Sequence, residues 1–419
     1  MDVRILRSEV DGKATPPPSK SYTHRAFIAA SLSPSALVEN PLFSDDTLAT
    51  LKACRFIGAE VTRWKDLIAF RGVEDVESSG YINVENSGTT LRLFLGILSH
   101  SKRICVIDGD SSLRKRPNRS LALTLNKLGA KIWGDYDFKA PLKVCGIVTG
   151  GEVSIRAESS QFISSLLFSL PLAKYDSEIK VEEVKSRPYI DITLHVLEES
   201  GIEVKADGKN FYIPGEQSYS LKTFSVPADF SSASYLIAAG LLAGRVEVLN
   251  MSDSRQGDKR IVDIAKQMGG NVRWDKENGV ITAKQSELEG IEVDASDIPD
   301  LVPTIAVLAA VARGKTTIYN AEHLRIKEID RIDGCYKNLR SLGIEVEKRR
   351  DGLVIKGGSI RGGTVDSFGD HRMALAFSLL GLVAEEGVTV KNAEVVSVSF
   401  PGYFDVLKNL SAKVEWIKS

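Results

Sequence analysis

At 419 residues the chain is longer than one hydrophobic core usually holds, so we expect two domains of roughly 200 residues each. Hydrophobic residues (43%) and charged residues (26%) occur at ordinary globular levels, which excludes the disordered and fibrous classes. The 54 Lys and Arg residues nearly balance the 55 Asp and Glu residues, so no overall field draws the chain onto nucleic acid or an anionic membrane.

The cysteines and histidines show no metal-binding pattern. The four cysteines are scattered without a CxxC pair, and the five histidines have no HExxH spacing. The opening MDVRILRSEV lacks the apolar stretch of a signal peptide, and the most apolar segments are shorter than the roughly 20 residues of a membrane helix. We therefore expect a soluble, cytoplasmic protein with reduced cysteines, no metal and no cofactor.

A unit of two helices and several short strands recurs six times along the chain. In each copy an amphipathic helix ends on a small residue just before a strand, and copies follow one another at about 70 residues. Glycine suits such a position because a left-handed residue without a Cβ avoids a clash. The six residues are Gly58, Gly129, Gly201, Gly269, Gly343 and Ser411.

A second, more apolar helix precedes each of these endings. We expect these helices to begin at capping residues, which in chain order are Ser19, Asn86, Ser159, Asp229, Asp300 and Asp370. Alternating segments such as GLVIKG predict the strands, and Asn278-Gly279 and Asp351-Gly352 predict hairpin turns. The pattern favours an α/β protein with three units in each of two lobes.

The lobe boundary is expected near Pro227, between the third and fourth copies. Because the first apolar helix begins only near Ser19, we expect the amino-terminal strand to pair with the carboxy-terminal lobe. One predicted lobe is therefore residues 1–13 with 227–419, and the other is residues 14–226. Two chain crossings between the lobes would make a hinge.

Unusual polar residues gather at the starts of the apolar helices, where free N–H groups and helix dipoles favour anions. Lys20 and Arg25 lie at the first start, although a capped helix with solvated charges is an open alternative. The loop SSLRKRPNRS is basic but lacks the interleaved aromatic residues of a nucleic-acid surface. Phosphate clamping by one or two of its arginines is more plausible. Surface charge pairing is the open alternative for RIKEIDR.

Taken in order, the motifs PSKSYTHR, NSGTTLR, LRKRP, SSQF, SRPYIDIT, DFSSASY, DIPDLVP, RIKEIDR, DHRMA and FPGYF resemble those of the 5-enolpyruvylshikimate-3-phosphate synthase family. The resemblance spans nearly the whole chain. It implies two inverse α/β barrel domains of three repeats each. It also implies transfer of enolpyruvate from phosphoenolpyruvate to the 5-hydroxyl of shikimate 3-phosphate, on the path to chorismate, through a tetrahedral intermediate between closing lobes. We expect a monomer without nucleic-acid or membrane partners.

The resemblance also implies residue roles. The expected phosphoenolpyruvate contacts are Lys20, Gly88, Thr89, Arg116, Gln161, Arg331 and Arg372. The expected shikimate 3-phosphate contacts are Lys20, Ser21, Arg25, Ser159, Ser160, Gln161, Ser186, Tyr189, Asp300, His323 and Lys327. The expected catalytic residues are Lys20, Asp300, Glu328 and His371, with Asp300 beside the attacking hydroxyl and Glu328 as proton donor to the methylene carbon.

The chain departs from the family pattern at three positions. His323 replaces a usual Asn, Leu93 replaces a common Pro, and Val398 replaces a Lys that completes the phosphoenolpyruvate site. One alternative is the related UDP-N-acetylglucosamine enolpyruvyl transferase, which typically has a Cys in the loop that reads SSLRKRPNR here. Another is a non-catalytic repeat scaffold, which would not need cations and carboxylates at its helix starts.

Overall fold

The structure is a computed structural model that describes residues 1–417. The chain divides into two compact units, each with its own hydrophobic core. The amino-terminal unit is Pro18–Val226, and the carboxy-terminal unit is Met1–Pro17 with the chain from Pro227 onward. The first crossing follows Pro17 and not residue 13, because strand β2 (Val10–Ala14) pairs over its whole length with β15 (Gly244–Val248).

Across residues 1–417 the strands form six four-stranded sheets, three in each unit. Every sheet has the same pattern, a parallel pair followed by two antiparallel strands. In the first sheet of the amino-terminal unit the strand order is β14 (Thr223–Ser225), β3 (Ala36–Glu39), β5 (Leu67–Arg71), β4 (Glu60–Trp64). In the second it is β6 (Gly80–Asn83), β7 (Cys105–Asp108), β9 (Leu142–Gly146), β8 (Ala130–Trp133). In the third it is β10 (Gly151–Ile155), β11 (Ser177–Val181), β13 (Asn210–Ile213), β12 (Lys205–Asp207).

The carboxy-terminal unit repeats this arrangement. Its orders are β2, β15, β17 (Val280–Lys284), β16 (Asn271–Asp275); β18 (Glu292–Asp294), β19 (Lys315–Tyr319), β21 (Gly352–Lys356), β20 (Glu345–Arg349); and β22 (Gly363–Asp366), β23 (Val388–Lys391), β1 (Asp2–Leu6), β24 (Lys413–Ile417). The expected hairpins at Asn278-Gly279 and Asp351-Gly352 are confirmed, since β16 pairs with β17 and β20 with β21.

Strands from the ends of each unit complete its sheets. The amino-terminal strand β1 pairs antiparallel with both β23 and β24, with Ile5 opposite Val388 and Val414. The pairing expected for the start of the chain is therefore confirmed. In the amino-terminal unit β14 returns to pair in parallel with β3. Each unit thus closes its repeat pattern with a strand that is distant in sequence.

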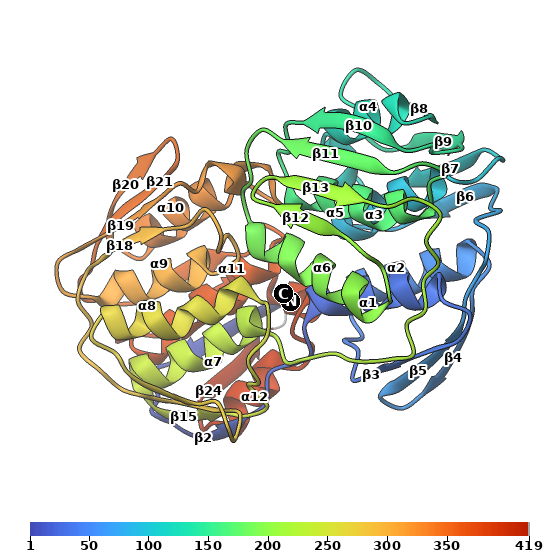
Figure 1. The fold of residues 1–419 in the computed structure, drawn as a ribbon. Helices are drawn as coiled ribbons and strands as arrows, with labels where there is room; N and C mark the ends of the chain where they lie inside the picture. The colour runs from blue at the N-terminus through green and yellow to red at the C-terminus, as the bar shows by residue number, and fades with distance from the viewer. Residues whose placement is uncertain (418–419) are drawn as a thin grey trace. The chain divides into compact units, whose positions relative to one another are not determined.

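The apolar helices form the cores of both units, because they are apolar on nearly all sides and bury best when surrounded. All fourteen residues of α7 (Phe230–Ala243) are buried. In the carboxy-terminal unit α9 packs against α7 and α11, and Figure 1 labels all three helices. The other core helices are α1 (Lys20–Ser31), α3 (Gly88–Leu98), α5 (Ser160–Ser169), α9 (Val302–Val311) and α11 (His371–Ser378).

A second helix in each repeat keeps one face toward solvent. These helices are α2 (Asp45–Phe56), α4 (Arg119–Lys127), α6 (Arg187–Glu199), α8 (Ile261–Gln267), α10 (Arg331–Ser341) and α12 (Tyr403–Asn409). The small residue expected after each one has a positive φ in all six copies, from 71° at Ser411 to 106° at Gly58 and Gly129. The repeat predicted from sequence is thus confirmed, and the two-domain α/β fold with it.

Four of the six expected caps are confirmed by side-chain hydrogen bonds, those of Ser19, Ser159, Asp229 and Asp370. Two were wrong. Ser87 caps α3 in place of Asn86, and α9 begins after Leu301, without a capping bond from Asp300. The carboxylate of Asp300 instead accepts hydrogen bonds from two arginines, as described below.

Candidate active site

In the amino-terminal unit, Lys20 opens α1 and Arg25 lies one turn further along it. The ammonium of Lys20 pairs with Asp46 on α2 (Nζ to Oδ2, 2.8 Å), and both side chains are mostly buried. Sequence reasoning missed Asp46, since nothing in the local motif links it to Lys20. The pair fixes a cation at the start of a buried helix.

Arg25 is fully buried and donates hydrogen bonds to several protein groups. Its guanidinium donates to the Thr193 hydroxyl (2.7 Å), to the Ser21 carbonyl (2.9 Å) and to the Tyr189 carbonyl (3.1 Å). Burial lowers the pKa of Arg25 to about 10, while the nearby Tyr189 and Tyr22 act in the opposite direction. Arg25 therefore ties together the backbone of two expected shikimate 3-phosphate contacts, Ser21 and Tyr189.

Gly88 and Arg116 lie side by side at the start of α3. A Cβ added to Gly88 would be 3.0 Å from Nη1 of Arg116 and 3.7 Å from Leu113. The other terminal nitrogen of Arg116, Nη2, donates to Oδ1 of Asn86 (2.8 Å). Two residues expected to bind phosphoenolpyruvate are therefore brought together, and the missing side chain of Gly88 leaves room beside a guanidinium.

Gln161 on α5 links the same region to α3. Its amide nitrogen donates to the Thr89 hydroxyl (2.8 Å), and its amide oxygen accepts from Nη1 of Arg92 (2.7 Å). Ser159 caps α5 by accepting from the Gln161 N–H (3.3 Å), and Ser160 is the first residue of that helix. Helix capping thus explains how these side chains come to lie at one end of α5.

Ser186 precedes α6 in the left-handed region, with φ 55° and ψ 42°. A serine pays a steric penalty there, and such conformations concentrate at functional sites. Pro188 follows in the first turn of α6, where its missing N–H costs no hydrogen bond. The side chain expected to contact substrate is therefore placed by an unusual backbone conformation.

In the carboxy-terminal unit, a cluster forms around the guanidinium of Arg331, the first residue of α10. Its Nε donates to Asp370 (2.7 Å), its Nη1 to Asp300 (2.7 Å) and its Nη2 to Glu328 (2.6 Å). Only 2% of the Arg331 side chain is exposed. Burial alone would lower the pKa of Arg331, but Asp370, Glu328 and Asp300 together raise it.

Arg372 joins the same cluster from α11. Its Nη2 donates to the second carboxylate oxygen of Asp300 (2.7 Å), and its Nη1 contacts the Tyr235 hydroxyl (3.4 Å). Asp300 therefore accepts one hydrogen bond from each of two arginines. This explains why it does not cap α9, whose first turn also contains a proline.

Two aspartates in this cluster were not among the expected site residues. Asp370 accepts from Arg331 and also from the backbone N–H of Arg372 (2.8 Å). Asp258 is buried and accepts a hydrogen bond from the Ser231 hydroxyl at the start of α7. Burial, with the charge of Asp300 as a further cause, raises the pKa of Asp258 to about 7. The capping of α11 by Asp370 was expected, but the bonds from Arg331 to Asp370 and from Ser231 to Asp258 join residues that are distant in sequence.

The remaining expected residues lie on neighbouring segments. His323 is buried on the short helix η4 (Glu322–Ile326), and Lys327 follows η4 directly, before Glu328. His371 is buried at the start of α11, next to Asp370. Val398 ends the short helix η6 (Ala393–Val398) and is half-buried.

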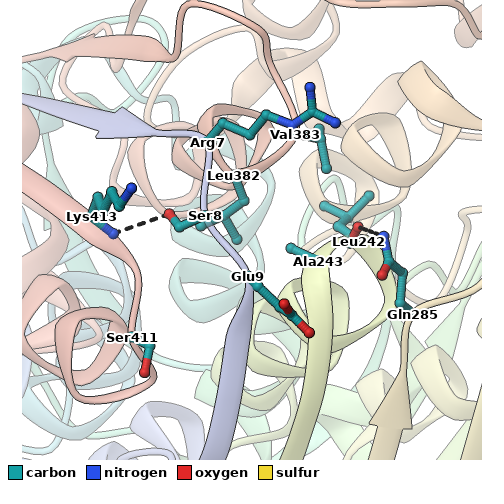
Figure 2. Close-up of a pocket in the computed structure, with 10 residues that line it drawn as sticks. All are labelled: Arg7, Ser8, Glu9, Leu242, Ala243, Gln285, Leu382, Val383, Ser411 and Lys413. Atoms are coloured by element: carbon teal, nitrogen blue, oxygen red, sulfur yellow. Dashed lines mark hydrogen bonds between the residues drawn. The ribbon is translucent and has the colours of Figure 1, made fainter.

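A cavity of about 570 Å³ lies at the opposite end of α7 from its cap (Figure 2). Its wall includes the α7 residues Leu242 and Ala243 and the β1–β2 connection, where the Ser8 hydroxyl accepts from the Lys413 N–H (3.1 Å). No residue expected in the site lines it. The residues expected from sequence to form the site therefore lie away from this cavity.

Within residues 1–417, no helix combines the length and hydropathy of a membrane span. The same part of the chain contains no group of three or more His, Cys, Asp or Glu side chains placed to hold a metal ion.

The fold and the clusters together define an enolpyruvyl transferase architecture. The chain superimposes on an EPSP synthase from Acinetobacter baumannii with a TM-score of 0.84 at 28% identity, over 99% of this chain and 100% of that one. An enolpyruvyl transferase from Streptomyces tendae shares the fold, with a TM-score of 0.80 at 16% identity, over 100% of this chain and 99% of that one.

The sequence comparisons are more specific. The family model described as EPSP synthase (3-phosphoshikimate 1-carboxyvinyltransferase) matches residues 6–407, and the chain belongs to that family. A 3-phosphoshikimate 1-carboxyvinyltransferase from Archaeoglobus fulgidus is 63% identical over 99% of both chains. One from Methanocella arvoryzae is 46% identical over 99% of this chain and 100% of its own.

Proposed function

We propose that this protein is a transferase that moves the enolpyruvyl group of phosphoenolpyruvate to the 5-hydroxyl of shikimate 3-phosphate and releases phosphate. Membership of the EPSP synthase family and relatives with that activity in their names support the reaction. The structural observation that carries the proposal is the joint contact of Asp300 and Glu328 with one buried guanidinium, that of Arg331. The reaction needs a base, an acid and a cation at one place.

Asp300 is the proposed base and Glu328 the proposed acid. Asp300 takes the proton of the 5-hydroxyl, whose oxygen forms a bond to C2 of phosphoenolpyruvate, while Glu328 gives a proton to the methylene carbon. The resulting tetrahedral carbon carries both phosphate and the shikimate oxygen. Cleavage of the C–O bond to phosphate, with return of a proton from the new methyl group to the Glu328 carboxylate, restores the carbon–carbon double bond as an enol ether and releases phosphate.

Arg331 and Arg372 form ion pairs with the proposed acid and base, and these ion pairs must open before the reaction. A carboxyl group beside a cation favours its ionised form, so Glu328 must separate from Arg331 before it can donate a proton. An anionic substrate that accepts hydrogen bonds from Arg331 and Arg372 would compete for these donors. Substrate binding itself would thus prepare the acid and the base.

The amino-terminal unit supplies most of the proposed contacts to shikimate 3-phosphate and part of those to phosphoenolpyruvate. Arg116 beside Gly88, and Lys20 at the start of α1, would hold phosphate or carboxylate groups. We propose that Arg25 contacts shikimate 3-phosphate and, through its bonds to the Ser21 and Tyr189 carbonyls, also fixes these two residues. The roles of His323, Lys327 and His371 remain those implied by the family motifs.

The test is phosphate release on incubation with phosphoenolpyruvate and either shikimate 3-phosphate or UDP-N-acetylglucosamine. We expect release only with shikimate 3-phosphate, and release only with the sugar nucleotide would reject the proposal. We also infer a cytoplasmic monomer, which light scattering would show as a mass near the 45.7 kDa of the chain. A mass of twice that value would contradict the monomer.

A further inference from the structure

Two arginines of the loop after β7 have different partners, although only one residue separates them. Arg114 donates from Nε and Nη2 to the two carboxylate oxygens of Asp108, at 2.9 and 2.6 Å. The Asp108 side chain is only 3% exposed, whereas that of Arg114 is 51% exposed. The Tyr81 hydroxyl (2.9 Å) and the Gly109 N–H (2.8 Å) also donate to Asp108. Asp108 is thus a fixed carboxylate to which Arg114 is bound.

A second carboxylate in the same loop orders the backbone that leads to Arg116. Oδ1 of Asp110 accepts from the N–H groups of Ser112 (3.0 Å) and Leu113 (2.7 Å), at the start of the short helix η1 (Leu113–Lys115). The Asp110 carbonyl accepts from the Arg114 N–H (3.0 Å). These bonds turn the chain so that the Leu113 side chain is buried and Arg116 follows at the end of η1.

Asp110 is also linked to the Arg116 side chain by hydrogen bonds through Asn86. Its Oδ2 accepts from the amide nitrogen of Asn86 (2.7 Å), and the amide oxygen of Asn86 accepts from Nη2 of Arg116 (2.8 Å). Since Asn86 presents one donor and one acceptor, its bond to Asp110 determines which end faces Arg116. The guanidinium is therefore oriented by a hydrogen-bond chain that begins at Asp110.

We propose that Asp108 and Asp110 are positioning residues for phosphoenolpyruvate, with Asp108 holding Arg114 away from the ligand and Asp110 orienting Arg116 toward it. The inference rests on the proposed function. The buried Asp108 already accepts hydrogen bonds from Tyr81 and Gly109, so the two-point contact with the half-exposed Arg114 fixes the position of that guanidinium as well as neutralising the carboxylate. Without that contact, the Arg114 cation would be released into the loop beside Arg116, where the two like charges would repel each other and displace Arg116 from the ligand.

The test compares the full-length wild type with Asp108→Asn and Asp110→Asn, which keep the side-chain shape and remove the charge. We expect each change to raise the KM for phosphoenolpyruvate about tenfold, the scale of one lost charge-assisted hydrogen bond. The KM for shikimate 3-phosphate should stay unchanged. Asp137→Asn is the matched control, because it breaks the Lys139 pair (2.6 Å) outside the site and should change neither constant.

A coupling measurement separates positioning from a general structural role. If Asp108 acts by restraining Arg114, adding Arg114→Gln to Asp108→Asn removes the released cation and should return the KM for phosphoenolpyruvate toward the wild-type value. Adding Arg114→Lys, which keeps the cation, should not. Equal rises in both KM values, or a lower melting temperature with unchanged KM values, would overturn the inference. The inference would also be overturned if the wild type is active and both Asp108→Asn and Asp110→Asn have wild-type kinetic constants.

Failure of the proposed function would be distinguishable, because the wild type would then release no phosphate from the two substrates. In that case calorimetric binding of phosphoenolpyruvate decides the inference. Equal affinities for the wild type, Asp108→Asn and Asp110→Asn would overturn it, and weaker binding by both variants would support it.

Discussion

Arg331 makes ion pairs with Asp370, Asp300 and Glu328 while almost entirely buried. Each terminal or bridging nitrogen has a separate carboxylate, which offsets the cost of removing the guanidinium from water. Breaking such a buried pair typically costs about 3 to 5 kcal/mol. Variants that probe the chemistry should therefore retain a hydrogen-bond acceptor at these positions.

Glu328→Gln meets this requirement, since its amide oxygen can still accept from Arg331. We expect the substitution to leave substrate binding largely intact and to lower kcat by about two to four orders of magnitude, because a proton donor is lost. Steady-state kinetics with both substrates measures this. Unchanged turnover would remove Glu328 from the mechanism.

Gly88→Ala tests the space beside Arg116. The added Cβ would lie 3.0 Å from Nη1 of Arg116, so the guanidinium must shift by a few tenths of an ångström. The family resemblance implies that glyphosate inhibits in competition with phosphoenolpyruvate. Glyphosate has a longer backbone than phosphoenolpyruvate and should be affected more. We expect the inhibition constant to rise by a larger factor than the KM for phosphoenolpyruvate. Equal factors would show that Gly88 does not face the inhibitor.

Val398→Lys restores the cation that the family motif usually carries. Arg114 is bound to Asp108 and is therefore not well placed to supply that charge. Because a charge-assisted hydrogen bond contributes about 1.5 to 3 kcal/mol, we expect the KM for phosphoenolpyruvate to fall about tenfold. Val398→Met, of similar length without charge, is the control. A KM that does not fall would mean that another cation already fills the role.

At the scale of elements, the outer helix of each repeat ends in a left-handed residue, and five of these six residues are glycines. The exception is Ser411, with φ 71°, after α12. An L-residue with a Cβ is strained in this conformation, whereas glycine is not. The last copy of the repeat thus has a strained backbone conformation at Ser411.

Ser411→Gly should remove that strain and stabilise the protein by about 1 kcal/mol, or about 2 °C in Tm. Gly343→Ser is the reciprocal control, because a Cβ at Gly343 meets no atom within 4 Å and only the backbone strain is added. It should lower Tm by a similar amount. Thermal unfolding that moves in the same direction for both variants would contradict this account.

At the scale of the whole molecule, the amino-terminal unit is continuous in sequence and the carboxy-terminal unit is not. Residues 18–226 contain all strands of three sheets and a separate hydrophobic core. The carboxy-terminal unit needs β1 and β2 from the start of the chain to complete two of its sheets. The two units therefore differ in how their folding depends on the rest of the chain.

We expect a fragment of residues 18–226 to fold alone and to unfold cooperatively, which circular dichroism during heating would show. A fragment that ends at Lys222 should be less stable. It lacks β14, the parallel partner of β3, and the buried ring of Phe224 that stacks on Tyr22 with ring centroids 5.7 Å apart. Equal melting temperatures would mean that β14 contributes nothing to the unit.

Features that depend on near neighbours could be read from the sequence. The left-handed residues after the outer helices, the caps at Ser19 and Asp370 and the two hairpins follow from local steric and hydrogen-bonding preferences, which act within a few residues. Repetition of these signals at one spacing revealed the six-unit organisation. The site residues were named through the family motifs, and local patterns alone left solvated charges as an alternative.

Features that depend on distant partners were decided only by the tertiary structure. Asp300 was expected to cap α9, but Arg331 and Arg372 from later helices bind both of its oxygens. The pairing of Lys20 with Asp46 and the split of Arg114 and Arg116 between Asp108 and Asn86 likewise join separate elements. The partner of an ionic side chain is one of the groups that packing brings within hydrogen-bond distance. The sequence near that side chain does not specify which groups these are.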